Sequence, residues 1–282
     1  MAVTRKNMIW LASYPKSGST WFRIFLSNLF SGSDQPVHIN HLAETIISSN
    51  RVVIDNYLGM HSSELSVEET NNFRPHVFKR FSEEQKGLVY VKTHEAWMRN
   101  SLGEPIFPEE ITKGVLYLIR NPLDIAISYA HHNNEPVDRT ISGINNEVYS
   151  ICEQKDRIFV QTQQVITSWS GHVRSWILES GLPVRVIRYE DMLQDPMVSF
   201  KNAIEFLDLR YEDEEIAQAI NHSTFDTLKA MEIKDGFAER GNRSEAFFRN
   251  GRAGEGVSAL SDTQIGEVVK THGEMMKRFG YL

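Results

Sequence analysis

A turn near the N-terminus carries the residue types that bind a phosphate-like anion. Within Ser13–Thr20, Lys16 is followed by the hydroxyl residues Ser17 and Ser19, and an apolar run comes directly after. Main-chain N–H groups at a helix N-terminus, the helix dipole, an ammonium and hydroxyl donors all favour a bound anion. The pattern predicts an anion site at this turn; a capped helix start with an incidental lysine is the alternative.

A second pair of residues capable of chemistry follows another apolar run. Lys92 and His94 come directly after Leu88–Val91, which has the composition of a short β-strand. In open parallel sheets, ligands collect at the carboxyl ends of the strands. Lys92 and His94 are therefore expected at the same edge as Lys16, although two solvated side chains after a strand would give the same pattern.

Arg120 and Ser128 form a third candidate group. Arg120 follows the apolar run Gly114–Ile119, and Ser128 lies in the helix expected next. The planar fork of an arginine and a serine hydroxyl suit one phosphate group. A salt bridge between Arg120 and Asp124 is the structural alternative.

The N-terminal turn is not the common nucleotide-binding loop. That loop has the pattern G-x-x-x-x-G-K-[ST], with lysine directly after the second glycine. Here Lys16 lies two residues before Gly18, and no glycine opens the turn. The sequence therefore favours an anion site but does not favour ATP or GTP.

Strands and helices must alternate to bring these groups together. Besides the runs above, strands are expected at Met8–Ala12 and Val184–Arg188, and the last is followed by Tyr189. Helices are expected after Thr20, from Ser66, over Pro122–His132 and Val165–Ile177, from Pro196, over Glu212–Ala219, from His222 and after Ser261. The order predicts an α/β fold: a P-loop-like parallel sheet flanked by helices on both faces, in a single domain over residues 1–282.

Composition narrows the function further. The chain has 282 residues and a net charge of −7, which argues against a broad nucleic-acid-binding face. Cys152 is the only cysteine, so an intrachain disulfide and a cysteine-rich metal site are excluded. No run approaches the roughly 20 apolar residues that cross a bilayer, and the N-terminus does not resemble a signal peptide. We expect a cytoplasmic, soluble protein that uses no metal.

Two polar segments and the histidines are harder to interpret. Residues 133–158 are predicted to form either a mobile lid or a disordered segment, and residues 234–256 a functional loop. His172 lies on an apolar helical stripe and is expected to be a packed core residue. His38, His41 and His61 are expected on the surface rather than as metal ligands. The aromatic residues Tyr57, Phe73, Phe78 and Phe81 suit either an acceptor pocket or the core.

The motifs together resemble one protein family. YPKSGSTW, KTH, RNPLDIAIS, WSGHVRSW, RYED, STF and FFRNG occur in this order and span nearly the whole chain. Their order resembles that of cytosolic-type sulfotransferases, which use 3′-phosphoadenosine 5′-phosphosulfate (PAPS). The resemblance implies a sulfotransferase-type fold. It also implies transfer of the PAPS sulfuryl group to a hydroxyl or amine of a small-molecule or glycoconjugate acceptor, with PAP as the other product.

The resemblance also implies a role for each matched position. His94 would be the general base, and Lys16 and Lys92 would stabilise charge during catalysis. The residues implied to bind PAPS are Lys16, Ser17, Gly18, Ser19, Thr20, Trp21, Arg120, Ser128, Tyr189, Thr224, Phe225, Arg249, Asn250 and Gly251. Among these, Trp21 and Phe225 would lie near the adenine, while Arg120 and Ser128 would hold the 3′-phosphate.

The implied chemistry agrees with these residue types. A sulfuryl group passes in line between two oxygens, much as a phosphoryl group does. It carries less negative charge than a phosphoryl group, so lysines can replace Mg²⁺ in stabilising the transition state. A neutral histidine is suited to accept the hydroxyl proton near pH 7.

The last motif departs from the family pattern. Where the family has R-K-G-x-x-G-D-W-K, this chain has RNGRAGEG, so Asn250 replaces a lysine and the Trp-Lys pair is missing. We hypothesise that Arg252 supplies the lost charge, which loss of PAPS affinity in Arg252→Ala would support. The dimer segment of the family is not recognisable either, so the sequence leaves the oligomeric state open.

Two other functions remain possible from the sequence. A P-loop kinase for a small molecule shares the architecture, but this chain lacks the lysine directly after glycine that such a kinase has. A non-catalytic nucleotide-binding protein would bind PAPS without turnover, and the retained Lys92 and His94 argue against it. The acceptor is expected to contact residues 36–80, 133–158 and 234–248, and its identity does not follow from the sequence.

Overall fold

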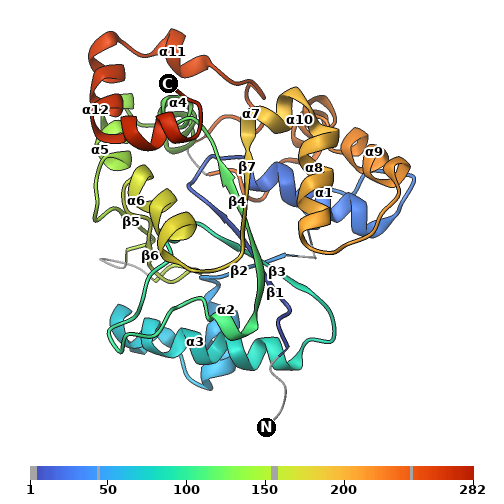
Figure 1. Ribbon diagram of the computed structural model, residues 1–282, viewed down its shortest axis with the longest axis vertical. Coiled ribbons are helices and arrows are strands. Elements are labelled where there is room, and N and C mark those ends of the chain that lie inside the picture. The colour runs from blue at the N-terminus through green and yellow to red at the C-terminus, as the bar shows by residue number, and fades with distance from the viewer. Residues whose placement is uncertain (1–4, 43–44, 154–157, 242–243) are drawn as a thin grey trace. The chain divides into compact units, whose positions relative to one another are not determined.

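A five-stranded sheet runs through the chain (Figure 1). The computed structural model describes residues 5–42, 45–153, 158–241 and 244–282. The strands of this sheet are β1 (Met8–Ser13), β2 (Thr45–Ile47), β3 (Val89–Thr93), β4 (Thr112–Ile119) and β7 (Val184–Arg188), in the order β2-β3-β1-β4-β7. Strands β1 and β2 both pair with β3 in parallel. A separate antiparallel pair consists of β5 (Ser150–Ile151) and β6 (Gln164–Val165).

Helices flank the sheet. The α-helices are α1 (Ser19–Ser31), α2 (Arg51–Leu58), α3 (Val67–Glu84), α4 (Pro122–Asn133), α5 (Val137–Ile144), α6 (Trp169–Arg174), α7 (Tyr189–Gln194), α8 (Pro196–Phe206), α9 (Asp213–His222), α10 (Phe225–Asp235), α11 (Glu255–Ala259) and α12 (Asp262–Arg278). Short 3₁₀ turns occur at η1 (Ser62–Glu64) and η2 (Glu109–Ile111), and a π-helical turn, η3 (Ser175–Glu179), follows α6. The predicted α/β fold class, a parallel sheet with flanking helices, is confirmed.

By its internal contacts the chain divides into two compact units. Unit 1 comprises Met1–Tyr14, Thr45–Tyr117 and Asn146–Arg185, and unit 2 comprises Pro15–Glu44, Leu118–Asn145 and Val186–Leu282. The prediction of a single domain over residues 1–282 stays a prediction.

The core of unit 1 is aromatic. The Trp10 ring of β1 lies 5.1 Å from Phe78 and 4.9 Å from Phe107, both edge-on, and its indole N–H donates to Thr112 Oγ1 at 2.8 Å. Edge-to-face packing with a satisfied indole N–H stabilises a buried tryptophan. Phe78, left open by the sequence between core and acceptor pocket, is therefore a core residue.

Local signals in the sequence fix the ends of several helices. The Ser66 side chain and Glu69 form the predicted capping box before α3, which ends at Glu84. In unit 2, Asp195 accepts from the N–H of Val198 at 3.0 Å and Pro196 opens α8, as expected.

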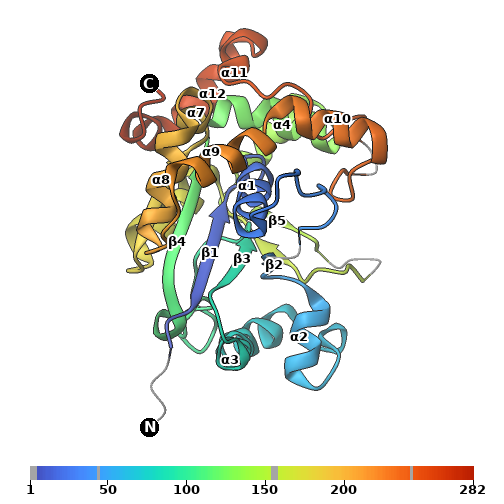
Figure 2. The same cartoon turned by 90° about the vertical axis from the view of Figure 1, so that its right-hand side faces the viewer.

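Figure 2 shows α2 beside α3 at one end of strands β1 and β3.

Unit 2 has its own aromatic core. Phe22 and Phe25 of α1 lie against Phe200 of α8, with ring centroids 5.5 Å and 4.1 Å apart. Helix α12 packs against α4 and α5, as Figure 1 shows near the C-terminus. These contacts anchor α1 and α4, the two helices that begin directly after candidate site residues.

Two sequence expectations need correction. Residues 137–144, for which disorder was one of the two expectations, form helix α5, because Thr140, Ile141 and Ile144 are buried within unit 2. The alternative, a mobile lid, stays a prediction. The expected helix over Val165–Ile177 begins only at Trp169, since Gln164–Val165 pairs with β5. The remainder of the 133–158 segment includes residues 154–157, which lie outside the described residues.

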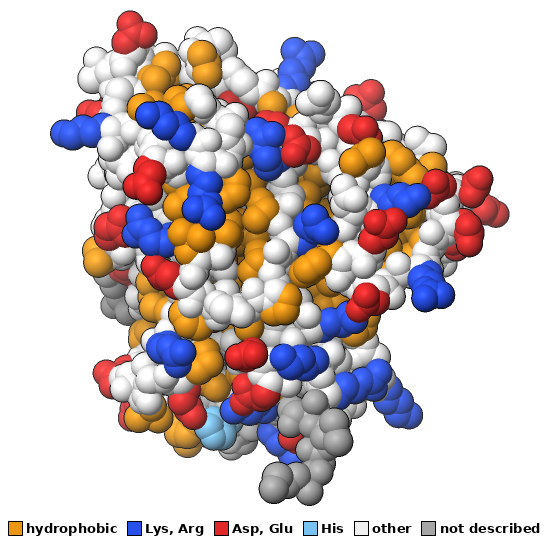
Figure 3. Space-filling model, in the orientation of Figure 1, with side chains coloured by type: hydrophobic (Ala, Val, Ile, Leu, Met, Phe, Trp, Pro, Cys, Tyr) orange, Lys and Arg blue, Asp and Glu red, His pale blue; other side chains and the backbone are white. Residues whose placement is uncertain are grey.

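Charges of both signs are interspersed on the face shown in Figure 3, without a broad basic area there. Among the described residues, no helix combines the length and apolar composition needed to cross a membrane. Cys152 is half-buried and has no disulfide partner, as the sequence requires.

Candidate active site

The turn before α1 contains two residues with left-handed backbone angles. Lys16 has φ 70° and Gly18 has φ 96°, both in the left-handed region. A Cβ at Gly18 would lie 2.8 Å from Cδ2 of Tyr189, so both the conformation and the space require glycine. Turns with such backbone angles before a helix form anion-binding concavities.

Three hydroxyl residues of this turn are buried. Ser17 is fully buried, and its Oγ has no hydrogen-bond partner among the described residues. Ser19 and Thr20 are each 6% exposed, and Thr20 Oγ1 donates to Glu239 Oε2 at 3.4 Å. A buried hydroxyl without a protein partner indicates a position for a ligand oxygen.

Arg120 brings the third candidate group to this turn. Its Nη1 donates to the Lys16 carbonyl at 3.2 Å and its Nη2 to the Arg252 carbonyl at 3.0 Å. The guanidinium carbon lies 4.2 Å from the centroid of the Tyr189 ring, and the residue is 7% exposed. Its buried Nε has no partner among the described residues. Lys16, Arg120 and Tyr189 therefore form one cluster in unit 2.

Asp124 anchors the segment that contains Arg252. Its two carboxylate oxygens accept from the N–H groups of Gly254, at 2.8 Å, and Gly256, at 2.7 Å. Asp124 is 2% exposed and lies 3.8 Å from Arg120, so the salt bridge considered from the sequence exists. The ion pair uses Nη2 of Arg120 and not its buried Nε. Arg120 can therefore pair with Asp124 and still donate to a ligand.

An aromatic ring supports the lysine of the turn. The Lys16 ammonium lies 4.2 Å from the centroid of the Phe247 ring, a cation–π distance. The N–H groups of Phe247 and Phe248 both donate to the buried carboxylate of Glu232, at 2.7 Å and 2.8 Å. Glu232 thus fixes the backbone that carries the ring against Lys16.

Two aromatic residues predicted to lie near the adenine, Trp21 and Phe225, each contact another residue of the predicted PAPS site. Trp21 lies edge-on to Tyr189, with centroids 6.0 Å apart, and its N–H donates to the Ser223 carbonyl at 2.9 Å. A Cβ at Gly251 would lie 2.4 Å from the Phe225 ring, so the Gly251 backbone packs directly on that ring. Gly251 and Phe225, both predicted to bind PAPS, are therefore in contact.

Other sequence-predicted residues of unit 2 have local partners. Ser128 is half-buried one helical turn after Asp124 on α4. Thr224 is exposed and caps α10 by accepting from the Thr227 N–H at 3.4 Å. Arg249 forms an ion pair with Glu255, and the Asn250 side chain also bonds to Glu255. The pKa of Glu255 is lowered chiefly by its hydrogen bond to Arg249.

In unit 1, a hydrogen bond fixes the tautomer of His94. Its Nδ1 lies 2.9 Å from the Ser13 carbonyl oxygen and 3.2 Å from Ser13 Oγ. A carbonyl oxygen only accepts, so Nδ1 carries the proton and the basic lone pair of the neutral ring lies on Nε2. Lys92 is half-buried on β3, two residues before.

A second histidine supports the backbone of the first. His172 is fully buried, its Nε2 donates to the His94 carbonyl at 3.0 Å, and its Nδ1 accepts from the Tyr117 hydroxyl at 2.7 Å. Burial lowers the pKa of His172 to about 3, so the ring is neutral at neutral pH. The expectation of a packed core histidine is confirmed, and its role in holding His94 is additional.

A buried ion pair holds the residue after His94. Both Glu95 oxygens accept from Arg74 of α3 at 2.5 Å, and Glu95 Oε2 also accepts from Ser48 Oγ at 2.9 Å. The Glu95 carbonyl accepts from the Trp176 indole N–H at 2.8 Å. Because Arg74 and Glu95 are 0% and 3% exposed, the segment after β3 has little freedom.

Sequence reasoning missed the residues that position the site. Asp124, Glu232, Arg74 and Glu95 are acidic or basic residues buried at 6% exposure or less, and none of them belongs to a motif position assigned a role. Within the described ranges, no group of three or more His, Cys, Asp and Glu residues could hold a metal ion.

Comparison with known proteins identifies the family. The family model described as "Sulfotransferase domain" matches residues 6–280. The chain belongs to the sulfotransferase domain family. The resemblance noted from the sequence motifs is thereby confirmed.

The curated relatives of this sulfotransferase-family chain are distant. Luciferin sulfotransferase of Photinus pyralis is 24% identical over 234 residues, which cover 80% of this chain but only 57% of that protein. Cytosolic sulfotransferase 12 of Arabidopsis thaliana is 23% identical over 276 residues, covering 96% of this chain and 77% of that protein.

Solved structures share the fold. A mouse sulfotransferase, SULT7A1, complexed with PAP has a TM-score of 0.60 and 20% identity, covering 97% of this chain and 85% of that one. Retinol dehydratase in complex with androsterone and PAP has a TM-score of 0.63 and 17% identity, covering 97% and 81%.

Proposed function

We propose that this sulfotransferase-family protein transfers the sulfuryl group of PAPS to a hydroxyl, or an amine, of a small-molecule or glycoconjugate acceptor. The acceptor oxygen forms a bond to sulfur while the bond from sulfur to the 5′-phosphate oxygen breaks. PAP leaves, and a base takes the proton of the acceptor. Family membership supports this reaction, and structures of two fold relatives hold PAP.

The observation that carries the proposal is the pair of unused donors in unit 2. Ser17 Oγ and Arg120 Nε are both buried without a partner among the described residues, beside the left-handed turn at Lys16. Leaving such donors unpaired costs free energy, which ligand oxygens would recover. We propose that the turn from Lys16 to Trp21 binds the 5′-phosphosulfate and that Arg120 and Ser128 bind the 3′-phosphate.

His94 is proposed as the general base. Its hydrogen bond to the Ser13 carbonyl orients the ring and puts the basic lone pair on Nε2. His172 holds the His94 carbonyl and Arg74 holds the side chain of Glu95, the next residue, so the ring is pre-organised. A positioned histidine base typically contributes about 10²- to 10⁴-fold to rate.

Lysines are proposed to stabilise the charge that develops. Lys16 would offset charge on the leaving 5′-phosphate, and Lys92 would offset charge near the bridging oxygen. Arg249, Asn250 and Gly251 are proposed to close over the 3′-phosphate, which requires Arg249 to exchange its Glu255 partner for the ligand. The hypothesis that Arg252 replaces the family lysine stays open; its exposed side chain and its carbonyl bond to Arg120 are compatible with it.

The small molecules bound to relatives support a small-molecule acceptor. Retinol dehydratase has been solved in complex with androsterone and in complex with retinol, and a curated relative is a luciferin sulfotransferase. The names of the Arabidopsis relatives, cytosolic sulfotransferases, support a cytoplasmic location.

A nucleotide comparison tests the proposal against the two alternatives. We expect PAPS and PAP to raise the melting temperature at concentrations where ATP with Mg²⁺ does not, because only the first two carry a 3′-phosphate. Stabilisation by ATP with Mg²⁺ alone would indicate a kinase. Stabilisation by PAPS without sulfation of any acceptor in a broad phenol, alcohol and amine panel would indicate a non-catalytic protein.

A further inference from the structure

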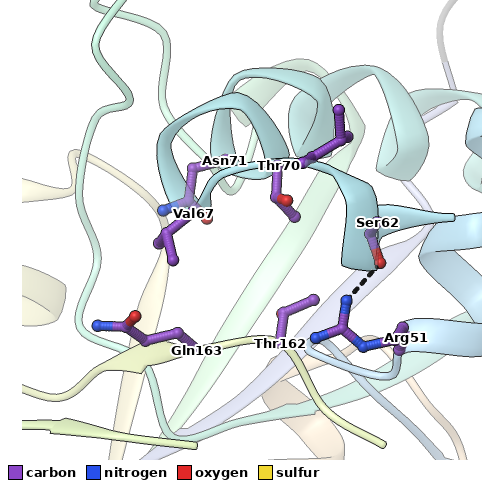
Figure 4. Close-up of a pocket in the computed structure, with 8 residues that line it drawn as sticks. Arg51, Ser62, Val67, Thr70, Asn71, Thr162 and Gln163 are labelled. Atoms are coloured by element: carbon purple, nitrogen blue, oxygen red, sulfur yellow. Dashed lines mark hydrogen bonds between the residues drawn. The ribbon is translucent and has the colours of Figure 1, made fainter. Parts of the chain in front are cut away.

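A small pocket with polar and apolar walls lies in unit 1 between the first turns of two helices and the segment before β6 (Figure 4). The cavity measures about 20 Å³, which is room for a group of one or two oxygens rather than for a whole ligand. The residues that line it are Arg51, Ser62, Leu65, Val67, Thr70, Asn71, Thr162 and Gln163. None of these positions has a role in the sulfuryl transfer proposed above.

Arg51 supplies an unused buried donor to this pocket. The residue is 8% exposed; its Nε donates to the Phe159 carbonyl at 2.9 Å and its Nη1 to Ser62 Oγ at 2.8 Å. Its Nη2 is buried and has no hydrogen-bond partner among the described residues. Figure 4 shows the guanidinium extending along the pocket beside Thr162. A buried guanidinium N–H without a partner is unfavourable, so this position suits an oxygen ligand.

The remaining polar walls offer further donors. Thr70 and Thr162 are each 5% exposed, and the side-chain amides of Asn71 and Gln163 lie at the other end of the pocket in Figure 4. Thr162 Oγ1 donates to the Ser49 carbonyl at 3.5 Å, so it can donate to a ligand only by giving up that long bond. A hydroxyl or amide can donate to a second ligand oxygen while Arg51 donates to the first. Such a set favours a group with two acceptor oxygens.

The local charge favours a singly charged group. Ser62 Oγ accepts from Arg51 and donates to Asp55, so a carboxylate already partly offsets the Arg51 charge. A dianionic phosphate would face that carboxylate as well as the guanidinium, whereas a carboxylate has one charge and can form a strong charge-assisted hydrogen bond. The pocket therefore fits a carboxylate better than a phosphate.

The pocket shares a buried network with the His94 segment. Asn71 Oδ1, on the pocket wall, accepts from Arg74 Nη1 at 3.3 Å, and the same guanidinium pairs with Glu95 at 2.5 Å. Glu95 directly follows His94 in the chain. One arginine thus connects the pocket wall to the segment that carries the proposed base.

From these contacts we propose that the pocket binds the carboxylate of the acceptor, so that the substrate is a hydroxycarboxylic acid sulfated at its hydroxyl. This inference rests on the sulfotransferase function proposed above. It assigns Arg51 as the specificity residue and Thr162, Asn71 and Gln163 as secondary contacts.

Matched acceptor pairs test the inference. Hydroxycarboxylic acids of graded length, both aryl and alkyl, are compared with their carboxamides, and kcat/KM with PAPS is measured for each member. We expect the best acid to exceed its amide by about 10-fold or more, the size of one charge-assisted hydrogen bond. Arg51→Met should remove that preference and Arg51→Lys should retain part of it, whereas Arg80→Met, on the exposed face of α3, should leave it unchanged.

Two further measurements keep the test decisive. Because Arg51 also bonds to the Phe159 carbonyl and can affect folding, Thr162→Val and Gln163→Leu provide variants that leave that bond in place, and each should reduce the preference about threefold or more. Calorimetric titration of the best acid, its amide and free propionate into the PAP-bound protein measures binding without turnover. Propionate binding as tightly as the acid would indicate a free carboxylate effector rather than an acceptor.

The outcomes separate this inference from the proposed function. Carboxylate binding that Arg51→Met abolishes, without any sulfation, would contradict the transferase function and retain the carboxylate site. Sulfation with equal kcat/KM for acids and amides would retain the transferase and overturn the carboxylate site. An acid preference that survives in folded Arg51→Met would also overturn it, and the pocket would then hold only water.

Discussion

Replacing His94 by asparagine would separate the proposed base from the structural role of the ring. The amide nitrogen introduced by His94→Asn can take the place of Nδ1 and donate to the Ser13 carbonyl, which His94 Nδ1 contacts at 2.9 Å. No basic atom remains at the position of Nε2. Since the His172 and Glu95 contacts involve the backbone or their own side chains, they should persist in the variant.

The expected loss is confined to turnover. General-base catalysis by histidine is worth about 10²- to 10⁴-fold, so kcat of His94→Asn should fall by that factor, or by about 2.7–5.4 kcal/mol in activation free energy. PAP affinity, measured by calorimetry, should change less than threefold, because the proposed donor residues lie in other segments.

The assay is single-turnover sulfation with enzyme in excess over PAPS, followed by rapid quench. His94→Gln, whose amide nitrogen matches Nε2 instead, provides the geometric control and should be at least as impaired. Turnover of His94→Asn within threefold of the unaltered protein would refute the assignment of His94 as the base.

Three other perturbations follow from the contacts. Arg120→Ala should weaken PAP binding by roughly 10- to 100-fold while AMP, which lacks the 3′-phosphate, loses less than threefold; equal losses in calorimetry would contradict the 3′-phosphate role. Phe247→Leu removes the ring under Lys16 and should weaken PAPS binding about 3- to 10-fold, with Phe247→Tyr near the original affinity; no change in Phe247→Leu would show that the ring does not position the lysine. His172 has a folded-state pKa of about 3, against 6.5 for an exposed histidine, so the unfolded chain binds the extra proton and stability falls as pH drops from about 6.5 toward 3. The free energy of unfolding, measured in urea, should fall with pH about 1.4 kcal/mol per pH unit less steeply for His172→Gln than for the unaltered protein across this range. Identical slopes for the two proteins would exclude His172 as the source of the pH dependence.

Features of the site that depend on neighbouring residues were predictable from the sequence. The turn at Lys16 and Gly18, the Ser66 capping box and the start of α8 all follow from short-range rules on glycine, capping and proline. Strand β3, which contains Lys92, and strand β4, which ends directly before Arg120, follow from continuous apolar runs, which suit buried parallel strands.

Features that depend on distant partners were not predictable. Glu95 pairs with Arg74, 21 residues away, and no residue pattern near Glu95 in the sequence indicates that pair. Asp124 was considered only as an Arg120 partner, whereas its main contacts are main-chain N–H groups 130 and 132 residues later. Helix α5 was missed because its few apolar residues gain their stability from packing within unit 2 rather than from local propensity.

The reaction itself gives the most direct test of the account. The purified protein is incubated with PAPS and the acceptor panel, and mass spectrometry measures acceptor mass together with the amount of PAP released. We predict that an acceptor gains one SO₃ group for each PAP formed, and that PAP release depends on the acceptor and is lost in His94→Asn. PAPS that stays intact with every acceptor, or PAP released without a sulfated product, would contradict it.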